Sequence, residues 1–262
     1  MLSFSELNRV WAVAVRNHAV TPMADGNGKS YLPIGAKTLT YLDALWTGQS
    51  DLPDIGAMIE AGKTVRFWGD PHYRHDNIRR LCDRDEFSSV EEMDETIERN
   101  VREAMDMSDV VVCVGDLAMK DAITYQTRMQ REFGDRHLIL LGNHDPKGAT
   151  PGEWARAGAL ASLAFSLPTK LLEGWVRGDS GDLAEFVDWS RLPARINFGC
   201  CHWPVPPDRL PGPAWVSVHG HTHNRHAGSL RLNCSVEAIG YRPALLRQLV
   251  TPELFEDLTR RQ

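Results

Sequence analysis

The chain has little cysteine, and its cysteines are not spaced as pairs. Among 262 residues there are five, at Cys82, Cys113, Cys200, Cys201 and Cys234, and none forms a CxxC spacing. An odd number of unpaired cysteines, several within apolar runs, argues against a disulfide framework. We therefore expect a reduced, cytoplasmic setting.

Long apolar runs and a strong excess of one charge are also missing. The apolar patch at residues 11–15 is flanked by Arg9 and Arg16, which is unlike a signal peptide, and no run approaches the ~20 residues of a membrane span. The net charge of -6 excludes a broadly basic nucleic-acid platform, although a local or metal-centred site can still bind phosphates. We expect no association with the membrane.

The first 62 residues differ in pattern from the rest of the chain. Ser3 and Glu6 are spaced as a capping box before apolar residues at helical spacing, and a second short helix is predicted around residues 39–46. We predict that residues 1–62 form a helical N-terminal extension, which packs on the main domain or contacts a partner or a second subunit. Residues 63–262 then form the main domain.

From Thr64 onward, short apolar strands alternate with amphipathic helices. Strands are predicted at 64–70, 110–116 and 137–143, separated by a helix capped near Ser88 or Ser89 and a helix at about 120–133. Two further strands are predicted at 196–204 and 215–221, on either side of a proline-rich loop. This alternation predicts a layered α/β fold.

Each predicted strand ends in residues that are able to bind metal ions. These are Asp70 and His72, then Asp116, then Asn143, His144 and Asp145, then His202, and finally His221 and His223. Sites in open α/β sheets form beyond the carboxyl ends of strands, so these groups are expected at one rim. Carboxylate, amide and imidazole ligands without thiolate suit Mn, Fe, Zn or Ni. A shared aspartate would hold two cations about 3.5 to 4 Å apart, as in displacement at phosphorus.

The order of these motifs resembles that of the calcineurin-like metallophosphoesterase superfamily. The motifs are DxH at 70–72, GD at 115–116, GNHD at 142–145, His202 and GHxH at 220–223. The resemblance covers roughly residues 64–245 and is nearest to small bacterial and phage phosphoesterases. It implies a layered α/β/β/α metallophosphoesterase sandwich, here with an N-terminal helical extension. We expect Gly115, Gly142 and Gly220 to bring backbone close to the metals.

The resemblance also implies a role for each site residue. One metal would be held by Asp70, His72 and His223, the second by Asn143, His202 and His221, and Asp116 would bridge them. The expected cofactors are two divalent ions, with Mn²⁺ first and Fe, Zn or Ni as alternatives. His144 would stabilise charge on phosphorus and protonate the leaving oxygen, and Asp145 would orient its ring.

His75 and Arg79 are weaker candidates for substrate binding. His75 follows a predicted ligand by three residues, and its alternative role is to cap the next helix. Arg79 is placed to meet a phosphate, and so is Arg84 in the loop that follows, but arginines on a helix and its following loop are more often solvated or paired with an acidic residue.

The implied reaction is hydrolysis of a phosphodiester in a nucleotide or nucleic acid, by attack of metal-activated hydroxide at phosphorus. The sequence after Asp116 is LAMK, without the arginine of the protein Ser/Thr phosphatases, which disfavours a phosphoprotein substrate. The alternatives are a phosphomonoesterase acting on a small phosphorylated metabolite and a metal-binding scaffold without catalysis. The spacing of His221, His223 and His226 also fits metallo-β-lactamase-like hydrolases, but Arg225 stands where that pattern needs aspartate.

Overall fold

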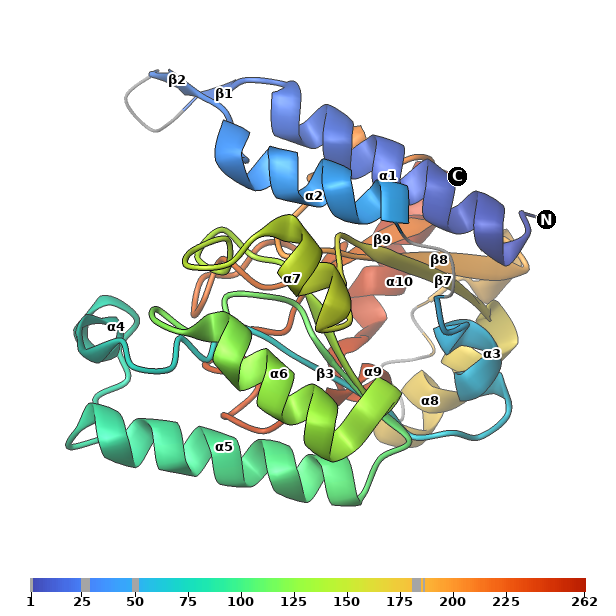
Figure 1. Cartoon of the computed structure of the whole chain (residues 1–262). Coiled ribbons are helices and arrows are strands. Elements are labelled where there is room, and N and C mark those ends of the chain that lie inside the picture. Colours follow the sequence, from blue (N-terminus) through green and yellow to red (C-terminus); the bar gives the residue numbers. More distant parts are fainter. Residues whose placement is uncertain (1, 25–28, 49–51, 181–184, 186) are drawn as a thin grey trace.

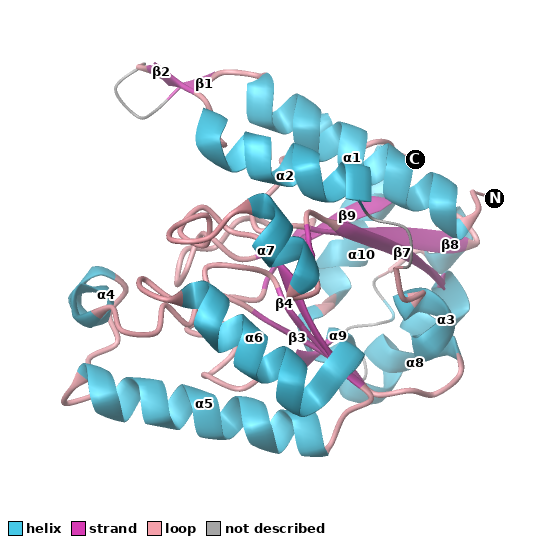
Figure 2. Ribbon diagram, in the orientation of Figure 1, coloured by secondary structure: helices cyan, strands magenta, loops and turns pink. Residues whose placement is uncertain are grey.

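The computed structural model describes residues 2–24, 29–48, 52–180, 185 and 187–262. Helices and strands of this part of the chain are arranged around two large sheets, with a separate two-stranded sheet near the N-terminus (Figures 1 and 2), which confirms the predicted mixed α/β class. The predicted N-terminal extension includes residues 1, 25–28 and 49–51, which lie outside the described residues.

The first sheet places four consecutive parallel strands side by side. Its described strands lie in the order β11-β3-β4-β5-β6, and only β11 at the edge is antiparallel to its neighbour. The bounds are β3 (Val65–Trp68), β4 (Val110–Cys113), β5 (His137–Leu140), β6 (Ala159–Leu160) and β11 (Ala244–Leu245). The loops that follow β3, β4 and β5 therefore leave the sheet at the same edge.

The second sheet has the described order β10-β9-β8-β7. Its strands are β7 (Leu163–Pro168), β8 (Arg195–Cys200), β9 (Trp215–His219) and β10 (Arg231–Asn233). β8, β9 and β10 are parallel, whereas β7 is antiparallel to β8. The strands predicted at 196–204 and 215–221 are present as β8 and β9, but both end before the predicted ligands His202 and His221, which lie in loops.

The two sheets share an apolar core. Alternate side chains of the facing strands are buried together, including Phe67 of β3, Phe165 of β7 and Phe198 of β8. The Phe165 ring lies 6.0 Å from that of Phe67 and 5.2 Å from that of Phe198, measured between ring centroids. This contact fixes the two sheets face to face, because successive side chains of a strand point to opposite faces.

Helices cover the outer face of each sheet (Figure 2). α5 (Val90–Asp106) and α6 (Ala122–Phe133) bury apolar residues against β4 and β5 of the first sheet. The predicted cap of α5 is confirmed, since the Ser89 side chain accepts a hydrogen bond from the Glu92 amide. α1 (Phe4–Val20) lies on β7 and β8 of the second sheet, so the layers run helix, sheet, sheet, helix.

The N-terminal helices are packed firmly on the two-sheet body. The predicted capping box of Ser3 and Glu6 is present at the start of α1. Trp11 is fully buried, donates from Nε1 to the Cys200 carbonyl at 3.0 Å and stacks on Trp215 at 5.7 Å between centroids. A Cβ atom on Gly199 would lie 2.2 Å from the Trp11 ring, so this close approach requires glycine. The predicted domain boundary at residue 62 stays a prediction.

The remaining described helices and strands complete the body. They are β1 (Met23–Ala24), β2 (Ser30–Tyr31), α2 (Ala36–Gly48), α3 (Ile55–Glu60), α4 (Asp76–Leu81), α7 (Pro151–Arg156), α8 (Thr169–Ser180), α9 (Leu246–Leu249) and α10 (Pro252–Arg261). α2 is the second predicted N-terminal helix. None of the helices in the described residues combines the length and apolar character needed to cross a membrane.

Candidate metal centre

The loops after five described strands bring the predicted ligands together. Asp70, Asp116 and Asn143 follow β3, β4 and β5 of the first sheet, and His202 and His221 follow β8 and β9 of the second. The two sets meet where the sheets face each other: His202 Nε2 lies 3.3 Å from Asp116 Oδ2. Residues separated by more than 80 positions thus form one polar cluster at the edge of the sandwich.

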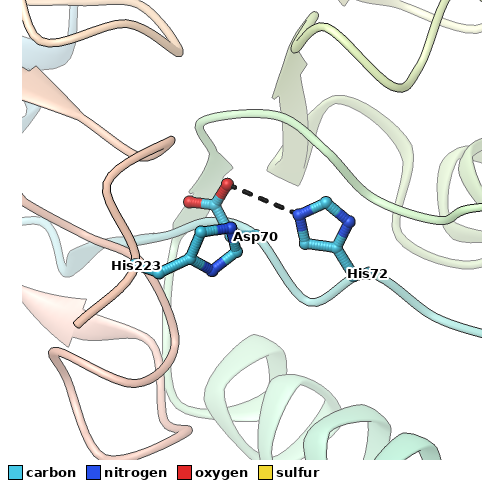
Figure 3. A group of neighbouring side chains, drawn as sticks. All are labelled: Asp70, His72 and His223. Carbon is cyan, nitrogen blue, oxygen red and sulfur yellow. Dashed lines mark ion pairs between the residues drawn. The ribbon is translucent and has the colours of Figure 1, made fainter. Parts of the chain in front are cut away.

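Asp70, His72 and His223 form the first group of predicted ligands (Figure 3), with one potential ligand atom of each within 4.8 Å of the others. His72 Nε2 lies 3.9 Å from Asp70 Oδ1. The His72 side chain is only 2% exposed, and neither ring nitrogen has a hydrogen-bond partner among the described residues. Burial lowers the pKa of His72 well below its ordinary value, so the ring is neutral and its lone pair is available to a cation.

Asn143, His202 and His221 form the second group. His202 Nε2 lies 3.0 Å from Asn143 Oδ1 and 3.2 Å from His221 Nδ1. The other ring nitrogen of His202 lies 3.0 Å from the Val114 carbonyl oxygen, to which it is placed to donate. That contact fixes the ring so that Nε2 faces the other two ligands.

Asp116 lies between the two groups. Its Oδ2 atom is 3.3 Å from His202 Nε2 and 3.6 Å from His72 Nε2, so one oxygen approaches a residue of each group. Burial opposes its ionisation, yet the pKa of Asp116 lies below its ordinary value because the imidazoles of His202, His72 and His144 surround it. This is the placement that the sequence predicts for a bridging carboxylate.

Asp70 is a second buried carboxylate in the same cluster. Burial raises its pKa above the ordinary value, and the charge of Asp116 adds to that increase, whereas His202 and His223 oppose it. Its oxygens accept hydrogen bonds from the His221 amide at 2.9 Å and from Ser235 Oγ at 2.8 Å. Two buried acidic groups therefore lie among imidazoles in one cluster, and a cation held there would compensate their negative charge.

The backbone at the candidate ligands is strained. Of the nine non-glycine residues with positive φ in the described part of the chain, five are predicted ligands: Asp70 (57°), His72 (52°), Asp116 (55°), His221 (67°) and His223 (53°). Such conformations are uncommon for residues with a side chain and cluster at functional sites. The fold therefore holds these five side chains in directions that relaxed loops would not give them.

Two of the predicted glycines are required by close approach to the carboxylates. A Cβ atom on Gly142 would lie 2.2 Å from Asp116 Oδ1, and one on Gly220 would lie 2.2 Å from Asp70 Oδ2. Both distances are far below van der Waals contact. The backbone at both glycines thus lies close to the candidate ligands Asp116 and Asp70, and the prediction that it lies close to metals stays a prediction.

His144 lies at the exposed side of the cluster, but Asp145 does not contact its ring. His144 Nε2 is 3.9 Å from Asp116 Oδ2, and its Nδ1 is 3.1 Å from Lys147 Nζ. The Asp145 carboxylate is buried and accepts hydrogen bonds from the backbone amides of Asp116 (2.8 Å), Leu117 (2.9 Å) and Gly142 (2.7 Å). Asp145 thus shapes the loops around Asp116, and the predicted orientation of His144 by Asp145 is corrected.

Of the two weaker candidates, only His75 lies near the cluster. Its ring centroid is 5.6 Å from that of His72. His75 precedes α4 but makes no capping hydrogen bond with its side chain. The Arg79 guanidinium instead donates to the Phe87 carbonyl at 2.6 Å and pairs with Asp76 at 3.2 Å. Its described contacts therefore hold a neighbouring loop, and the prediction that it binds substrate gains no support.

Three residues of the site were missed by sequence reasoning, namely Lys147, Ser235 and Glu237. Arg84 was considered as a phosphate contact, but its buried guanidinium donates to the carbonyl oxygens of Asp70 and Pro71. Ser235 and Glu237 follow β10, which is parallel to β9, so the strand-end rule would have found them if that strand had been recognised. β10 has only three residues, too few to give a clear alternating pattern. Lys147 lies in a loop, where no periodic pattern marks it.

Comparison with known proteins adds one relative. The chain is 25% identical over 190 residues to an uncharacterized protein of Methanocaldococcus jannaschii, and the aligned part covers 69% of this chain and 86% of that protein. No family model matches the chain, and no solved structure matches it.

Proposed function

We propose that the chain is a two-metal phosphoesterase of the calcineurin-like metallophosphoesterase superfamily, acting on a phosphodiester of a nucleotide or nucleic acid. The observation that carries the proposal is the meeting of two ligand groups around Asp116, which lies 3.3 Å from His202 of one and 3.6 Å from His72 of the other. The helix, sheet, sheet, helix layering is consistent with the sandwich of that superfamily.

The residues present fit a pair of divalent cations. His72 carries two buried ring nitrogens without a described partner, which is costly unless a further group satisfies them. Asp70, His72 and His223 would hold one cation, Asn143, His202 and His221 the other, and Asp116 would contact both. Oxygen and nitrogen donors without thiolate favour Mn²⁺, with Fe, Zn and Ni as alternatives.

The chain's own residues then provide proton transfer and positioning. Two cations held here would supply the nucleophile at neutral pH and offset the charge of the phosphate. Because Lys147 Nζ is placed to donate to His144 Nδ1, the ring proton of neutral His144 resides on Nε2, which faces Asp116. His144 is therefore oriented to give its Nε2 proton to a leaving oxygen on that side, while Nδ1 takes a proton from Lys147 so that the ring stays neutral.

Two observations favour an enzyme over a metal-binding scaffold. None of the seven ligand positions implied by the resemblance has lost its metal-binding residue type. The positive φ at five of these positions also costs conformational energy, and such strain is typical of sites whose function needs particular side-chain directions. We favour a phosphodiester substrate over a phosphomonoester of a small metabolite because of the family resemblance and the LAMK sequence after Asp116.

The test is hydrolysis of bis(nitrophenyl) phosphate with added Mn²⁺, in wild type and in Asp116→Asn and His202→Ala. Loss of metal-dependent nitrophenol release in both variants is the expected result, because each removes a group at the centre of the cluster. Asp43→Asn on α2, in an exposed ion pair with Arg16, is the matched control and should retain wild-type turnover.

Comparison with nitrophenyl phosphate separates the diesterase from the monoesterase. Turnover in Asp116→Asn equal to that of wild type would refute the assignment. A wild-type chain that binds two cations but hydrolyses neither ester, nor a panel of nucleotide diesters, would support the scaffold instead.

A further inference from the structure

A buried arginine lies behind the first group of ligands. The Arg84 guanidinium is fully buried and donates to the carbonyl oxygens of Asp70 at 2.6 Å and Pro71 at 2.8 Å. It also donates from Nε to Glu237 Oε1 at 2.7 Å. Removing an arginine from water costs several kcal/mol unless its donors are satisfied, and here they bind the backbone of a predicted metal ligand.

Glu237 connects this arginine to a second ligand of the same group. Its side chain is 5% exposed, and the Oε1 atom that accepts from Arg84 also lies 3.0 Å from His223 Nδ1. The contact with Glu237 occupies Nδ1 of His223, so Nε2 is the nitrogen left for a cation. In Figure 3 one ring nitrogen of His223 points towards Asp70 and the other points away.

Arg84 and Glu237 therefore connect the two sheets at one predicted metal position. Asp70 follows β3 of the first sheet and His223 follows β9 of the second, and Arg84 with Glu237 forms a continuous polar connection between them. The other position is held differently: His202 Nδ1 contacts the Val114 carbonyl oxygen at 3.0 Å, within hydrogen-bond distance, whereas Asp70 Oδ1 lies 3.9 Å from the same nitrogen.

We propose that Arg84 and Glu237 are positioning residues for the metal held by Asp70, His72 and His223, and that the second position does not depend on them. This inference rests on the proposed metal centre. A carboxylate that accepts from the distal nitrogen of a ligating histidine fixes the ring and makes it a better donor, and removing such a partner typically weakens metal binding by about 10–100-fold. The two positions should therefore respond differently to the same substitution.

The experiment is a Mn²⁺ titration of the full chain by equilibrium dialysis, with electron paramagnetic resonance to distinguish single from coupled ions. Glu237→Gln keeps the shape of the side chain and removes its charge. We expect about 10–100-fold weaker binding of one ion and an affinity for the other within about threefold of wild type. The signal of a coupled pair should give way to that of a single ion.

Two further variants assign the effect to a position. Asn143→Ala removes a ligand of the second position, so Asn143→Ala/Glu237→Gln should retain no tightly bound ion. Glu98→Gln is the control, because it removes the charge of a partly buried carboxylate that pairs with Arg102 on α5. This variant should bind both ions normally. If Glu237→Gln does not fold, as judged by circular dichroism, Glu237→Asp keeps the charge but withdraws it from His223 and should give the same one-ion result.

Failure of this inference is distinguishable from failure of the proposed function. Wild type that binds two ions and hydrolyses the diester, with folded Glu237→Gln binding both ions equally well, overturns the inference alone. Equal weakening of both positions also overturns it, because it indicates a general structural role. A wild-type chain that binds no Mn²⁺ overturns the inference together with the metal centre.

Discussion

Gly142→Ala tests the geometry of the site without removing a ligand. The added methyl group would lie 2.2 Å from Asp116 Oδ1 and 2.5 Å from the Asp116 backbone nitrogen. Ordinary contact begins near 3.4 Å, so Asp116 and the Gly142 loop must separate by about 1 Å. Since Oδ1 accepts a hydrogen bond from the His144 amide at 2.7 Å, the shift also disturbs the candidate acid.

The expected effect is large on catalysis and moderate on stability. A misplacement of about 1 Å in a catalytic group costs roughly 100-fold in rate, and forcing a methyl group into a packed site costs about 1–3 kcal/mol. We expect kcat/KM for bis(nitrophenyl) phosphate to fall by about 100-fold and Mn²⁺ affinity to fall with it. Both are measured well below the unfolding temperature, so that the loss is not caused by unfolding.

Gly174→Ala is the matched control, because a Cβ there meets nothing within 4 Å and the glycine lies in α8. Alanine in a helix stabilises by about 0.5–1 kcal/mol relative to glycine, so this variant should be slightly more stable and fully active. Wild-type metal affinity and turnover in folded Gly142→Ala would refute the placement of Asp116 at the centre of the site.

Three further predictions concern stability, packing and proton transfer. Burial lowers the pKa of His137 from 6.5 to about 4, so the unfolded chain binds its proton first as the pH falls. As the pH falls from 6.5 to 4, this histidine should lower the free energy of unfolding of the wild type by up to about 3 kcal/mol, and His137→Phe should abolish that decrease. Urea unfolding at each pH measures it, and an equal dependence of the free energy of unfolding on pH in both proteins would contradict the prediction. Trp11→Ala should destabilise the whole chain by about 3–5 kcal/mol in a single urea transition, because the ring is buried on the second sheet; loss of α1 alone, with an intact remainder, would instead indicate a separable extension. Lys147→Met should slow hydrolysis of phenyl esters about tenfold more than that of nitrophenyl esters, because His144 loses the partner at its Nδ1 atom; equal slowing of both esters would argue against proton donation by His144.

The sequence alone was sufficient for local features. The capping box of Ser3 and the cap at Ser89 were predictable because the donor and acceptor are three residues apart. Strands β3, β4 and β5 were predictable because a parallel strand buried on both faces is a short, continuous apolar run. The chemical types of the candidate ligands, and their position just after strands, follow from the same local pattern.

Only the tertiary structure decided which side chains meet. Asp145 is next to His144 in sequence, yet its carboxylate accepts hydrogen bonds from backbone amides, including that of Gly142. The His144 ring instead contacts Lys147 through Nδ1. Glu237 and Arg84 are 153 positions apart, and no sequence pattern predicts their contact, because a contact between distant loops depends on how the two sheets pack. Sequence patterns report the periodicity of one segment, whereas the direction of a loop side chain is fixed by hydrogen bonds and contacts from every segment around it.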